Sequence, residues 1–293
     1  LDRICAEKTL ETLHIATSDE LAQEPLLQLF YWRLVNHQSD GRVIPGGRHH
    51  NFYVDQELNF PNNVTLSYKE LSNLAWVING TQYPVTFDQC FDRARELLAP
   101  TYLTSYAACT AHGDAHNGNV WANKNDEGTI DLSWFDPAFA GTHIPVLLAE
   151  VKTLFHNIFA HPNWLYDAKE ADPLLDISCR VEGNKIFVEH NWELPALRKA
   201  FLYSKLENFW KPVLKVLTEQ EALPDYWEKY VRAALFCCPT LVMNLRAGEG
   251  TAQNSHTPKT SLLGISMAIM LFSAPADGQD DLSWFFDEIK AVL

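Results

Sequence analysis

The sequence lacks any stretch long and apolar enough to cross a membrane. Its longest apolar run, residues 262–272, contains Gly264 and Ser266 and falls well short of the roughly 20 residues that a membrane-spanning helix needs. No basic region followed by an apolar core opens the chain, as it would in a secretory signal. We therefore expect a cytoplasmic protein that has no membrane partner.

Cysteines are few and form no recognisable pair. The six of them are scattered without a C-x-x-C motif, and Cys237 and Cys238 stand next to each other within an apolar run. This pattern indicates small buried side chains in a reducing compartment, and it favours neither a zinc site nor a disulfide framework.

Basic residues are also scarce. Lys and Arg number 23 against 37 Asp and Glu, which gives a formal net charge of −14 and a pI near 5.2. Such an acidic chain is a poor partner for nucleic acid or for an anionic membrane surface. With 47% hydrophobic and 20% charged residues, the chain has ample material for a buried core.

What the sequence does contain is one stretch dense in polar side chains, residues 111–119 (AHGDAHNGN), followed shortly by residues 135–137 (FDP). Asp114 and Asn119 stand five positions apart, and His112 precedes the aspartate by two. With 11 histidines in the chain, His-x-Asp-x₄-Asn should occur by chance about 0.03 times. The flanking residues predict a strand at 106–111 and a β-hairpin over 119–135 with its turn at 124–128.

These residue types suit phosphoryl transfer. A carboxylate such as that of Asp114 accepts the proton that a hydroxyl or amine loses as it bonds to a γ-phosphorus. Gly113 and Gly118 let the backbone turn sharply enough to direct Asp114 and Asn119 into one cleft. Magnesium prefers oxygen ligands and keeps several waters, so the amide of Asn119 and one further carboxylate suffice to hold it.

The segment HGDAHNGN at residues 112–119 resembles the catalytic loop of the aminoglycoside phosphotransferase and choline kinase superfamily, whose usual form is His-Gly-Asp-x-His-x-x-Asn. The resemblance implies a protein-kinase-like fold and an ATP-dependent, magnesium-dependent kinase that acts on a small-molecule hydroxyl or amine. It implies that Asp114 is the catalytic base and that His112 shapes the loop. It also implies that Asn119 binds magnesium and that His116 lies with the cofactor-binding residues.

The second magnesium ligand has two candidates. Asp136, in Phe-Asp-Pro-Ala, is similar to the Ile-Asp-Pro-Ala form of fructosamine-kinase-like members, whereas Asp131, between Ile130 and Leu132, resembles the form of other members. We favour Asp136, because it ends the apolar run and a turn follows it. Asp131 would instead lie in the middle of a strand.

The half of a kinase that clamps the nucleotide is not evident. Residues 41–51 are loop-like, with several glycines, two arginines and two histidines, and resemble a phosphate-binding loop only superficially. The 64 residues between Gly47 and His112 (111 − 47) hold one lysine, Lys69, and no strand of the Val-Ala-x-Lys type. We therefore expect the amino-terminal lobe to lie upstream of a chain that begins with Leu1 rather than Met.

The expected fold is mainly α with small β-hairpins, a kinase-like carboxy-terminal lobe in one domain over residues 1–293. It divides into a helical subdomain (1–104), the catalytic loop with the metal-binding hairpin (105–141), and a helical region (142–293) with a β-hairpin insertion at 176–190. Helices are predicted at residues 2–38 with a cap at 17–20, and at 66–77, 86–98, 145–159, 195–217, 224–245, 262–272 and 281–292. A helix-start pattern is present at residues 86–89, Asn79-Gly80 is predicted to form a turn, and residues 248–261 are predicted to form a loop.

The helix after residue 145 departs from the family pattern. Members often carry an Asp-Leu-Ala there that ties the helix to the catalytic loop, whereas this chain has Leu-Leu-Ala at 147–149 and only Glu150 as a nearby carboxylate. The acceptor stays open as well. The acidic residues Glu150, Asp167, Glu170 and Asp172 could meet an ammonium group, or could simply be solvated.

Two other functions stay open at this point. The chain could be a kinase-like scaffold that binds a ligand or a partner protein without catalysis. A metallophosphoesterase would need an upstream Asp-x-His and a downstream Gly-Asn-His motif to hold two metals, and the sequence has neither.

Overall fold

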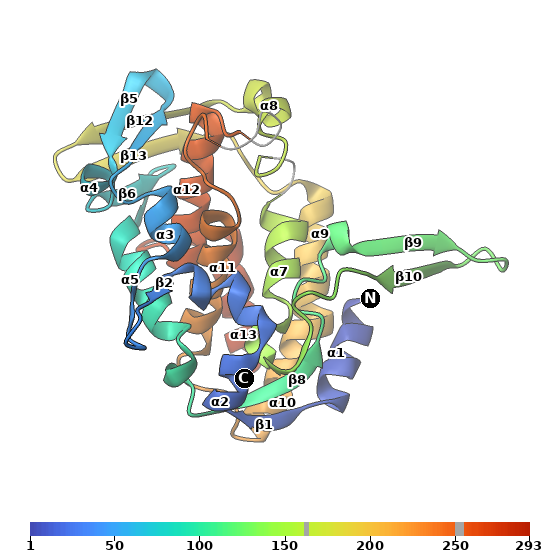
Figure 1. The fold of residues 1–293 in the computed structure, drawn as a ribbon. Helices are drawn as coiled ribbons and strands as arrows, with labels where there is room; N and C mark the ends of the chain where they lie inside the picture. The colour runs from blue at the N-terminus through green and yellow to red at the C-terminus, as the bar shows by residue number, and fades with distance from the viewer. Residues whose placement is uncertain (161–163, 250–254) are drawn as a thin grey trace.

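Short strands alternate with helices along the chain, which is a mixed α+β protein. The computed structural model describes residues 1–160, 164–249 and 255–293 (Figure 1). The helices are α1 (Asp2–Glu11), α2 (Ser18–Gln23), α3 (Gly47–Phe52), α4 (Tyr68–Leu71), α5 (Phe87–Leu97), α6 (Val146–Ala149), α7 (Val151–Leu154), α8 (Ala168–Ala171), α9 (Ala196–Lys205), α10 (Lys211–Glu219), α11 (Trp227–Val242), α12 (Pro258–Phe272) and α13 (Asp281–Lys290). The strands are β1 (His14–Thr17), β2 (Val35–His37), β3 (Val43–Pro45), β4 (Glu57–Phe60), β5 (Val64–Ser67), β6 (Ala75–Ile78), β7 (Thr81–Tyr83), β8 (Ser105–Ala111), β9 (Val120–Lys124), β10 (Ile130–Trp134), β11 (Gly141–Pro145), β12 (Ile177–Glu182) and β13 (Lys185–His190).

Helices α11 and α12 lie at the centre of the molecule (Figure 1). Both are buried along nearly their whole length, as expected for helices that are apolar on every side. α5 packs against α11 through Phe91, whose ring meets that of Phe236 edge to face at 4.9 Å. The interior of the fold is therefore helical, and the strands lie around it.

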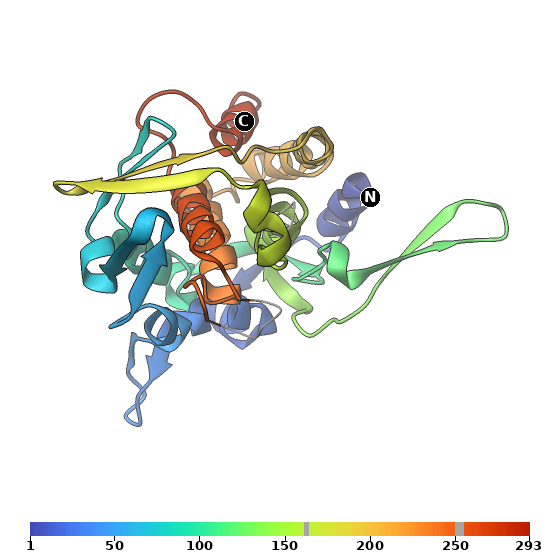
Figure 2. The same ribbon diagram turned by 90° about the horizontal axis from the view of Figure 1, so that it is seen from above.

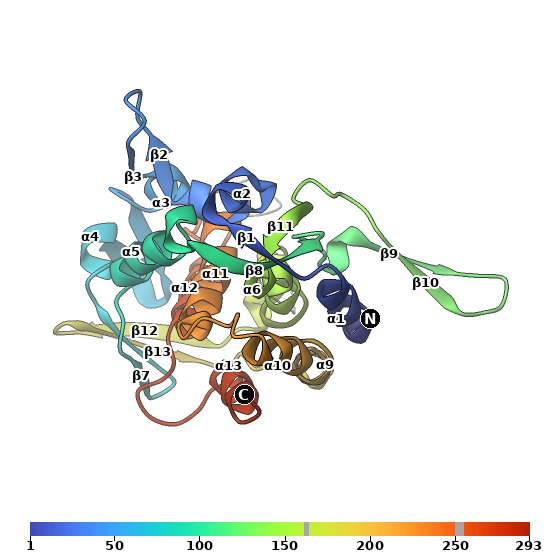
Figure 3. The ribbon, with the colours of Figure 1, turned by 90° about the horizontal axis from the view of Figure 1, so that it is seen from below.

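A three-stranded antiparallel sheet, of order β1-β8-β11, lies at the lower end of the molecule in Figure 1 and is seen from below in Figure 3. β8 is its middle strand, and residues 106–109 of that strand are buried. The strand predicted at residues 106–111 is thus confirmed. Because both of its edges are paired, β8 has a fixed position in the fold.

A second sheet has the order β12-β13-β6-β7. The hairpin predicted at residues 176–190 is confirmed as β12 and β13, and β13 also pairs in parallel with β6. The turn predicted at Asn79 and Gly80 joins β6 to β7, with φ of 48° and 79° at those two residues.

The ribbon of β9 and β10 stands away from the rest of the molecule (Figures 1 and 2). Val120 pairs with Trp134 at one end and Lys124 with Ile130 at the other, which confirms the predicted hairpin. Almost all of its side chains are exposed, including Trp121 at 60% and Ile130 at 67%.

Several predictions for the first hundred residues are wrong. Of the two helices expected within residues 2–38, the first ends before β1, and the second, α2, ends before Pro25 because a proline does not continue a preceding helix. Two 3-10 turns follow, η1 (Pro25–Leu29) and η2 (Tyr31–Arg33). Residues 41–51, predicted as a loop, include β3 and most of α3.

Residues 66–77, predicted as one helix, hold the end of β5, the short helix α4 and most of β6. The run Trp76-Val77-Ile78 suits a buried strand as well as a helix, because a short apolar run has no readable period. Pairing with β13, far along the chain, decides the outcome.

The predicted caps are confirmed. The side chains of Thr17 and Thr86 accept hydrogen bonds from the backbone three residues later, in capping boxes with Glu20 and Gln89.

The other predicted helices are all present, although their ends are shifted; they were expected at 86–98, 145–159, 195–217, 224–245, 262–272 and 281–292. Two of them include a short π-helical segment, at Phe155–Phe159 (η6) and Leu206–Trp210 (η8). The loop expected at 248–261 lies partly outside the described residues, and α12 begins at Pro258. Within the described ranges, no helix combines the length and the apolar character that crossing a bilayer requires.

Candidate active site

The HGDAHNGN segment leaves the fold at the end of β8. The strand ends at Ala111 and His112 follows directly. A 3-10 turn at Asn117–Asn119 (η5) then leads into β9. The loop therefore starts from a strand that is held on both edges and returns into the exposed hairpin.

Gly113 lets the loop approach the chain that follows the hairpin. Its φ is 77°, in the left-handed region that favours glycine. A Cβ atom at this position would lie 2.4 Å from the carbonyl oxygen of Phe139, so any other residue would push the two segments apart. Residues 112–114 and 135–139 are thereby brought together.

His112 links the same two segments. Its Nε2 donates a hydrogen bond to the carbonyl oxygen of Phe135 at 2.9 Å, and its Nδ1 accepts one from the backbone nitrogen of Asp114 at 3.4 Å. Both ring nitrogens are used in holding the loop. These contacts agree with a loop-shaping role for His112 rather than with a role in proton transfer.

Asn119 closes the loop from its other end. Its Nδ2 donates to the carbonyl oxygen of Asp114 at 2.9 Å, and its own carbonyl oxygen accepts from the backbone nitrogen of Phe135 at 3.1 Å. Among the described residues, none donates a hydrogen bond to Oδ1 of Asn119. That oxygen is the atom that Asn119 can offer to a cation.

The two candidates for the second metal-binding aspartate lie in different places. Asp136 follows Phe135 directly, so its backbone is one residue from the contacts with His112 and Asn119; its φ is 57° and its side chain is exposed. Asp131 lies in mid-strand on β10, where its Oδ2 accepts a hydrogen bond from Nδ2 of Asn125 at 3.2 Å. The backbone contacts thus bring Asp136, and not Asp131, next to the loop.

The carboxylate of Asp114 faces a lysine that sequence reasoning missed. Asp114 is 13% exposed, and its Oδ1 lies 3.6 Å from Nζ of Lys152 on α7, which is 4% exposed. His116 Nε2 lies 3.9 Å from the same oxygen. One carboxylate oxygen is therefore buried between two nitrogens, and Oδ2 is left for any substrate. The sequence did carry one signal for this contact, because Lys152 is the single lysine in the mainly apolar residues 145–159.

His116 supports the loop through its other nitrogen. Its Nδ1 accepts a hydrogen bond from the backbone nitrogen of Gly118 at 3.0 Å, which caps the 3-10 turn. Its ring lies 4.7 Å from that of His156, whose Nδ1 pairs with the hydroxyl of Tyr166 at 2.9 Å. His116 was predicted as a cofactor-binding residue, and the contacts described here are with the protein.

The helical segment after β11 is tied to the loop without the Asp-Leu-Ala of the family. Besides Lys152, the side chain of Asn157 accepts a hydrogen bond from the backbone nitrogen of Asn117 at 2.8 Å. Glu150 instead turns away and pairs with the buried Lys205 and with Thr153. The connection between loop and helix is therefore made by different side chains from those that the family pattern suggested.

A further cationic group that interacts with Asp114 is Arg33, and Arg48 lies beside it. Arg33 and Arg48 both donate to the carbonyl oxygen of Leu241, at 3.2 and 2.7 Å, at the end of α11. Burial, and secondarily the charge of Arg48, lowers the pKa of Arg33 to about 10, while the negative charge of Asp114 acts in the opposite direction. Arg33 remains a cation at neutral pH and contributes positive charge to this region.

The acidic residues considered for an ammonium-bearing acceptor do not gather around Asp114. Glu150 is buried in its pairing with Lys205, Asp167 and Glu170 are exposed, and Asp172 is half-buried. None of them has an ion pair or hydrogen bond with the catalytic-loop segment among the described residues. The charges found next to Asp114 are positive instead.

The described residues contain no group of three or more His, Cys, Asp and Glu side chains arranged to hold a metal ion. A magnesium ion bound by one amide oxygen and one carboxylate, with water completing its shell, needs no such group. Comparison of the chain with protein-family models, with curated proteins and with solved structures found no match.

Proposed function

We propose that the chain carries the catalytic and magnesium-binding side of an ATP-dependent phosphotransferase that acts on a small-molecule hydroxyl or amine. The observation that supports this most is a pair of hydrogen bonds at Phe135, whose carbonyl oxygen accepts from His112 and whose backbone nitrogen donates to Asn119, because they draw Asp136 toward the loop that carries Asp114. The backbone next to Asp136 thus lies beside the loop that carries Asp114 and Asn119, which is what a shared phosphoryl-transfer site would require.

Asp114 is the general base in this proposal. Because its Oδ1 is enclosed beside Lys152, the other oxygen accepts the proton as the acceptor oxygen or nitrogen bonds to the γ-phosphorus of ATP, while the bond from that phosphorus to the β,γ-bridging oxygen breaks and ADP leaves. Asn119 and Asp136 would hold magnesium, since an amide oxygen and a carboxylate are the hard ligands it prefers. When bound, magnesium would neutralise charge on the phosphates.

His112 and His116 act through the loop. Each uses a ring nitrogen to hold backbone that positions Asp114 and Asn119. A cytoplasmic location is part of the proposal, and it is supported by the cysteines. All six lie in described residues and all are free thiols, as expected in a reducing compartment.

The test is ATP consumption with magnesium across a panel of amines, amino alcohols, sugars and their acidic derivatives. We expect turnover with at least one acceptor, and we expect Asp114→Asn to lower kcat by about 10²–10⁴-fold because it removes the general base. Thermal melting of both proteins checks that the variant is folded. Turnover that is unchanged in Asp114→Asn would remove the assignment.

A kinase-like scaffold without catalysis is the second candidate. It is favoured by the pairing of Asp114 with Lys152, which neutralises the carboxylate in the absence of substrate. Calorimetric titration with Mg-ADP, together with the acceptor panel, separates the two functions. Binding of the nucleotide without turnover on any acceptor would favour the scaffold.

A further inference from the structure

Two arginines close to the catalytic loop have no carboxylate partner. Arg33 comes from η2 and Arg48 from α3, and each donates through Nη1 to the carbonyl oxygen of Leu241. Arg48 also donates to the carbonyl oxygen of Val242 at 3.0 Å, and its guanidinium lies over the ring of Phe52. Neither arginine forms an ion pair with any residue that the structure describes. Two half-buried positive charges therefore lie side by side.

The end of α11 balances only part of this charge. Leu241 and Val242 are the last residues of that helix, and the terminal carbonyls of a helix carry about half an elementary negative charge. Basic side chains often cap helix ends in this way. Two guanidinium groups, however, bring two full positive charges to one helix end. Positive charge is therefore in excess here, in a chain whose formal net charge is −14.

The carboxylate of Asp114 does not remove the excess. Its charge acts on Arg33, but its Oδ1 already lies 3.6 Å from Nζ of Lys152, which supplies one positive charge for that one carboxylate. Burial also lowers the pKa of both Arg33 and Arg48, as expected for cations whose loss of hydration is not fully compensated. An anion bound at the two arginines would supply the missing negative charge.

The two guanidinium groups keep nitrogens that a ligand can reach. Nε and Nη2 of Arg33 and of Arg48 make no hydrogen bond with the described residues. Unlike Oδ1 of Asp114, none of these nitrogens is an enclosed atom without a partner, so each retains accessible surface. Guanidinium groups present parallel N–H donors that match the oxygens of a carboxylate or a phosphate. The pair therefore has the chemistry of an anion site.

The arrangement of the elements indicates which ligand carries the anion. α3 and α11 lie on one side of α7, and the hairpin of β9 and β10 lies on the other (Figures 1 and 2). In phosphoryl transfer the attacking and leaving oxygens lie roughly in line, on opposite sides of the γ-phosphorus. The magnesium-bound nucleotide would occupy the side of the hairpin, where Asn119 and Asp136 lie. The arginines are then on the side of the acceptor.

We propose that Arg33 and Arg48 bind an anionic group of the acceptor, a carboxylate or a phosphate, and that the acceptor is an acidic small molecule with a separate hydroxyl or amine. The identity of the bound group as part of the acceptor rests on the proposed function. The anion site itself rests on the two arginines. An acceptor that carries an ammonium group would meet like charge at this place.

Inorganic phosphate is the probe for the anion site. It is titrated into the full chain at low ionic strength, and binding is followed by phosphorus NMR. We expect Arg33→Gln and Arg48→Gln each to weaken phosphate binding about tenfold, the effect of one lost charge-assisted hydrogen bond, and Arg33→Lys to lose less because it keeps the charge. Arg42→Gln changes an exposed arginine that pairs with Asp40, and as the matched control it should bind like the wild type. Thermal melting shows which variants are folded.

Failure of the wild type to bind phosphate, or unchanged binding by folded Arg33→Gln and Arg48→Gln, would overturn the anion site. Phosphate is then titrated with Mg-ADP present at saturation, and binding that still depends on both arginines is expected. Displacement of phosphate by Mg-ADP would assign the arginines to the nucleotide and overturn the acidic acceptor, as would turnover confined to uncharged or cationic acceptors. A wild type that binds phosphate through the arginines but does not bind Mg-ADP would instead contradict the proposed function and leave the anion site in place.

Discussion

At the scale of single residues, the contact between Asp114 and Lys152 explains how the carboxylate of the loop can be buried. A buried carboxylate is stable only beside an opposite charge or hydrogen-bond donors, and Lys152 lies 3.6 Å from its enclosed oxygen. The sequence predicted Asp114 from its motif. It could not predict Lys152 as its neighbour, because only the folded position of α7 brings the two residues together.

This pairing predicts a non-additive effect on stability. Lys152→Met should lower the free energy of unfolding by about 2–4 kcal/mol, because it leaves the charge of Asp114 buried without a partner. When Lys152→Met is combined with Asp114→Asn, it should lower the free energy of unfolding much less, since no charge is left unpaired. Urea denaturation of the wild type, the two single variants and the double variant measures the coupling between the two residues, and Lys8→Met on the surface serves as the control. Equal losses in both backgrounds would mean that the two residues are not coupled.

At the scale of elements, features that depend on residues close together in the sequence were predicted correctly. The capping box at Thr86 and the turn at Asn79-Gly80 depend on residues a few positions apart, and both are confirmed. The strand β6 was taken for helix because its pairing partner, β13, lies far along the sequence. The short strand β1 was missed for the same reason, since it forms by pairing with β8.

A buried histidine just before α12, His256, makes the free energy of unfolding depend on pH. His256 precedes the capping box of Thr257 and Thr260 and is 2% exposed, with Nδ1 3.1 Å from Oγ1 of Thr260. Burial lowers its pKa to about 4, below the roughly 6.5 of an unfolded chain. Between these two values the unfolded state binds more protons, so stability is full above pH 6.5 and is lost as the pH falls toward 4.

His256→Asn should therefore weaken the pH dependence of folding. Between pH 7 and pH 5 we expect the wild type to lose about 2 kcal/mol more of its unfolding free energy than the variant does. Denaturant titrations at the two pH values give this difference. His37→Asn, which changes an exposed histidine, is the matched control and should behave like the wild type. An identical pH dependence in His256→Asn and the wild type would contradict the expected effect.

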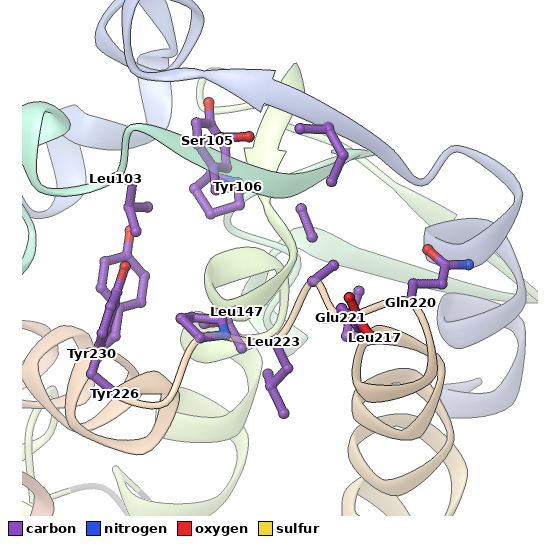
Figure 4. A pocket seen from close by; sticks show the side chains of 15 residues that line it. Leu103, Ser105, Tyr106, Leu147, Leu217, Gln220, Glu221, Leu223, Tyr226 and Tyr230 are labelled. Atoms are coloured by element: carbon purple, nitrogen blue, oxygen red, sulfur yellow. The ribbon is translucent and has the colours of Figure 1, made fainter.

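At the scale of the whole molecule, β8 runs between the catalytic-loop segment and a cavity lined by Tyr106, Tyr226 and Tyr230 (Figure 4). The catalytic loop follows one end of this strand, and the tyrosine-lined cavity lies at the other. The sequence predicted the strand and the loop, because both are encoded within a dozen residues. It did not predict the cavity, whose walls come from segments as distant as β1 and α11 and meet only in the folded chain. The parallel pairing of β13 with β6 was likewise beyond local signals.

The proposed function depends on Asn119 and Asp136 holding one magnesium ion beside the loop of Asp114. Calorimetric titration of Mg-ADP into the wild type, Asp136→Asn and Asp131→Asn tests this most directly, because the two variants remove the same charge from the two candidate ligands. We predict that Asp136→Asn weakens binding at least about tenfold, the effect of losing a charged metal ligand, and that Asp131→Asn binds like the wild type. Equal binding by Asp136→Asn and the wild type, or a loss confined to Asp131→Asn, would contradict the proposed site.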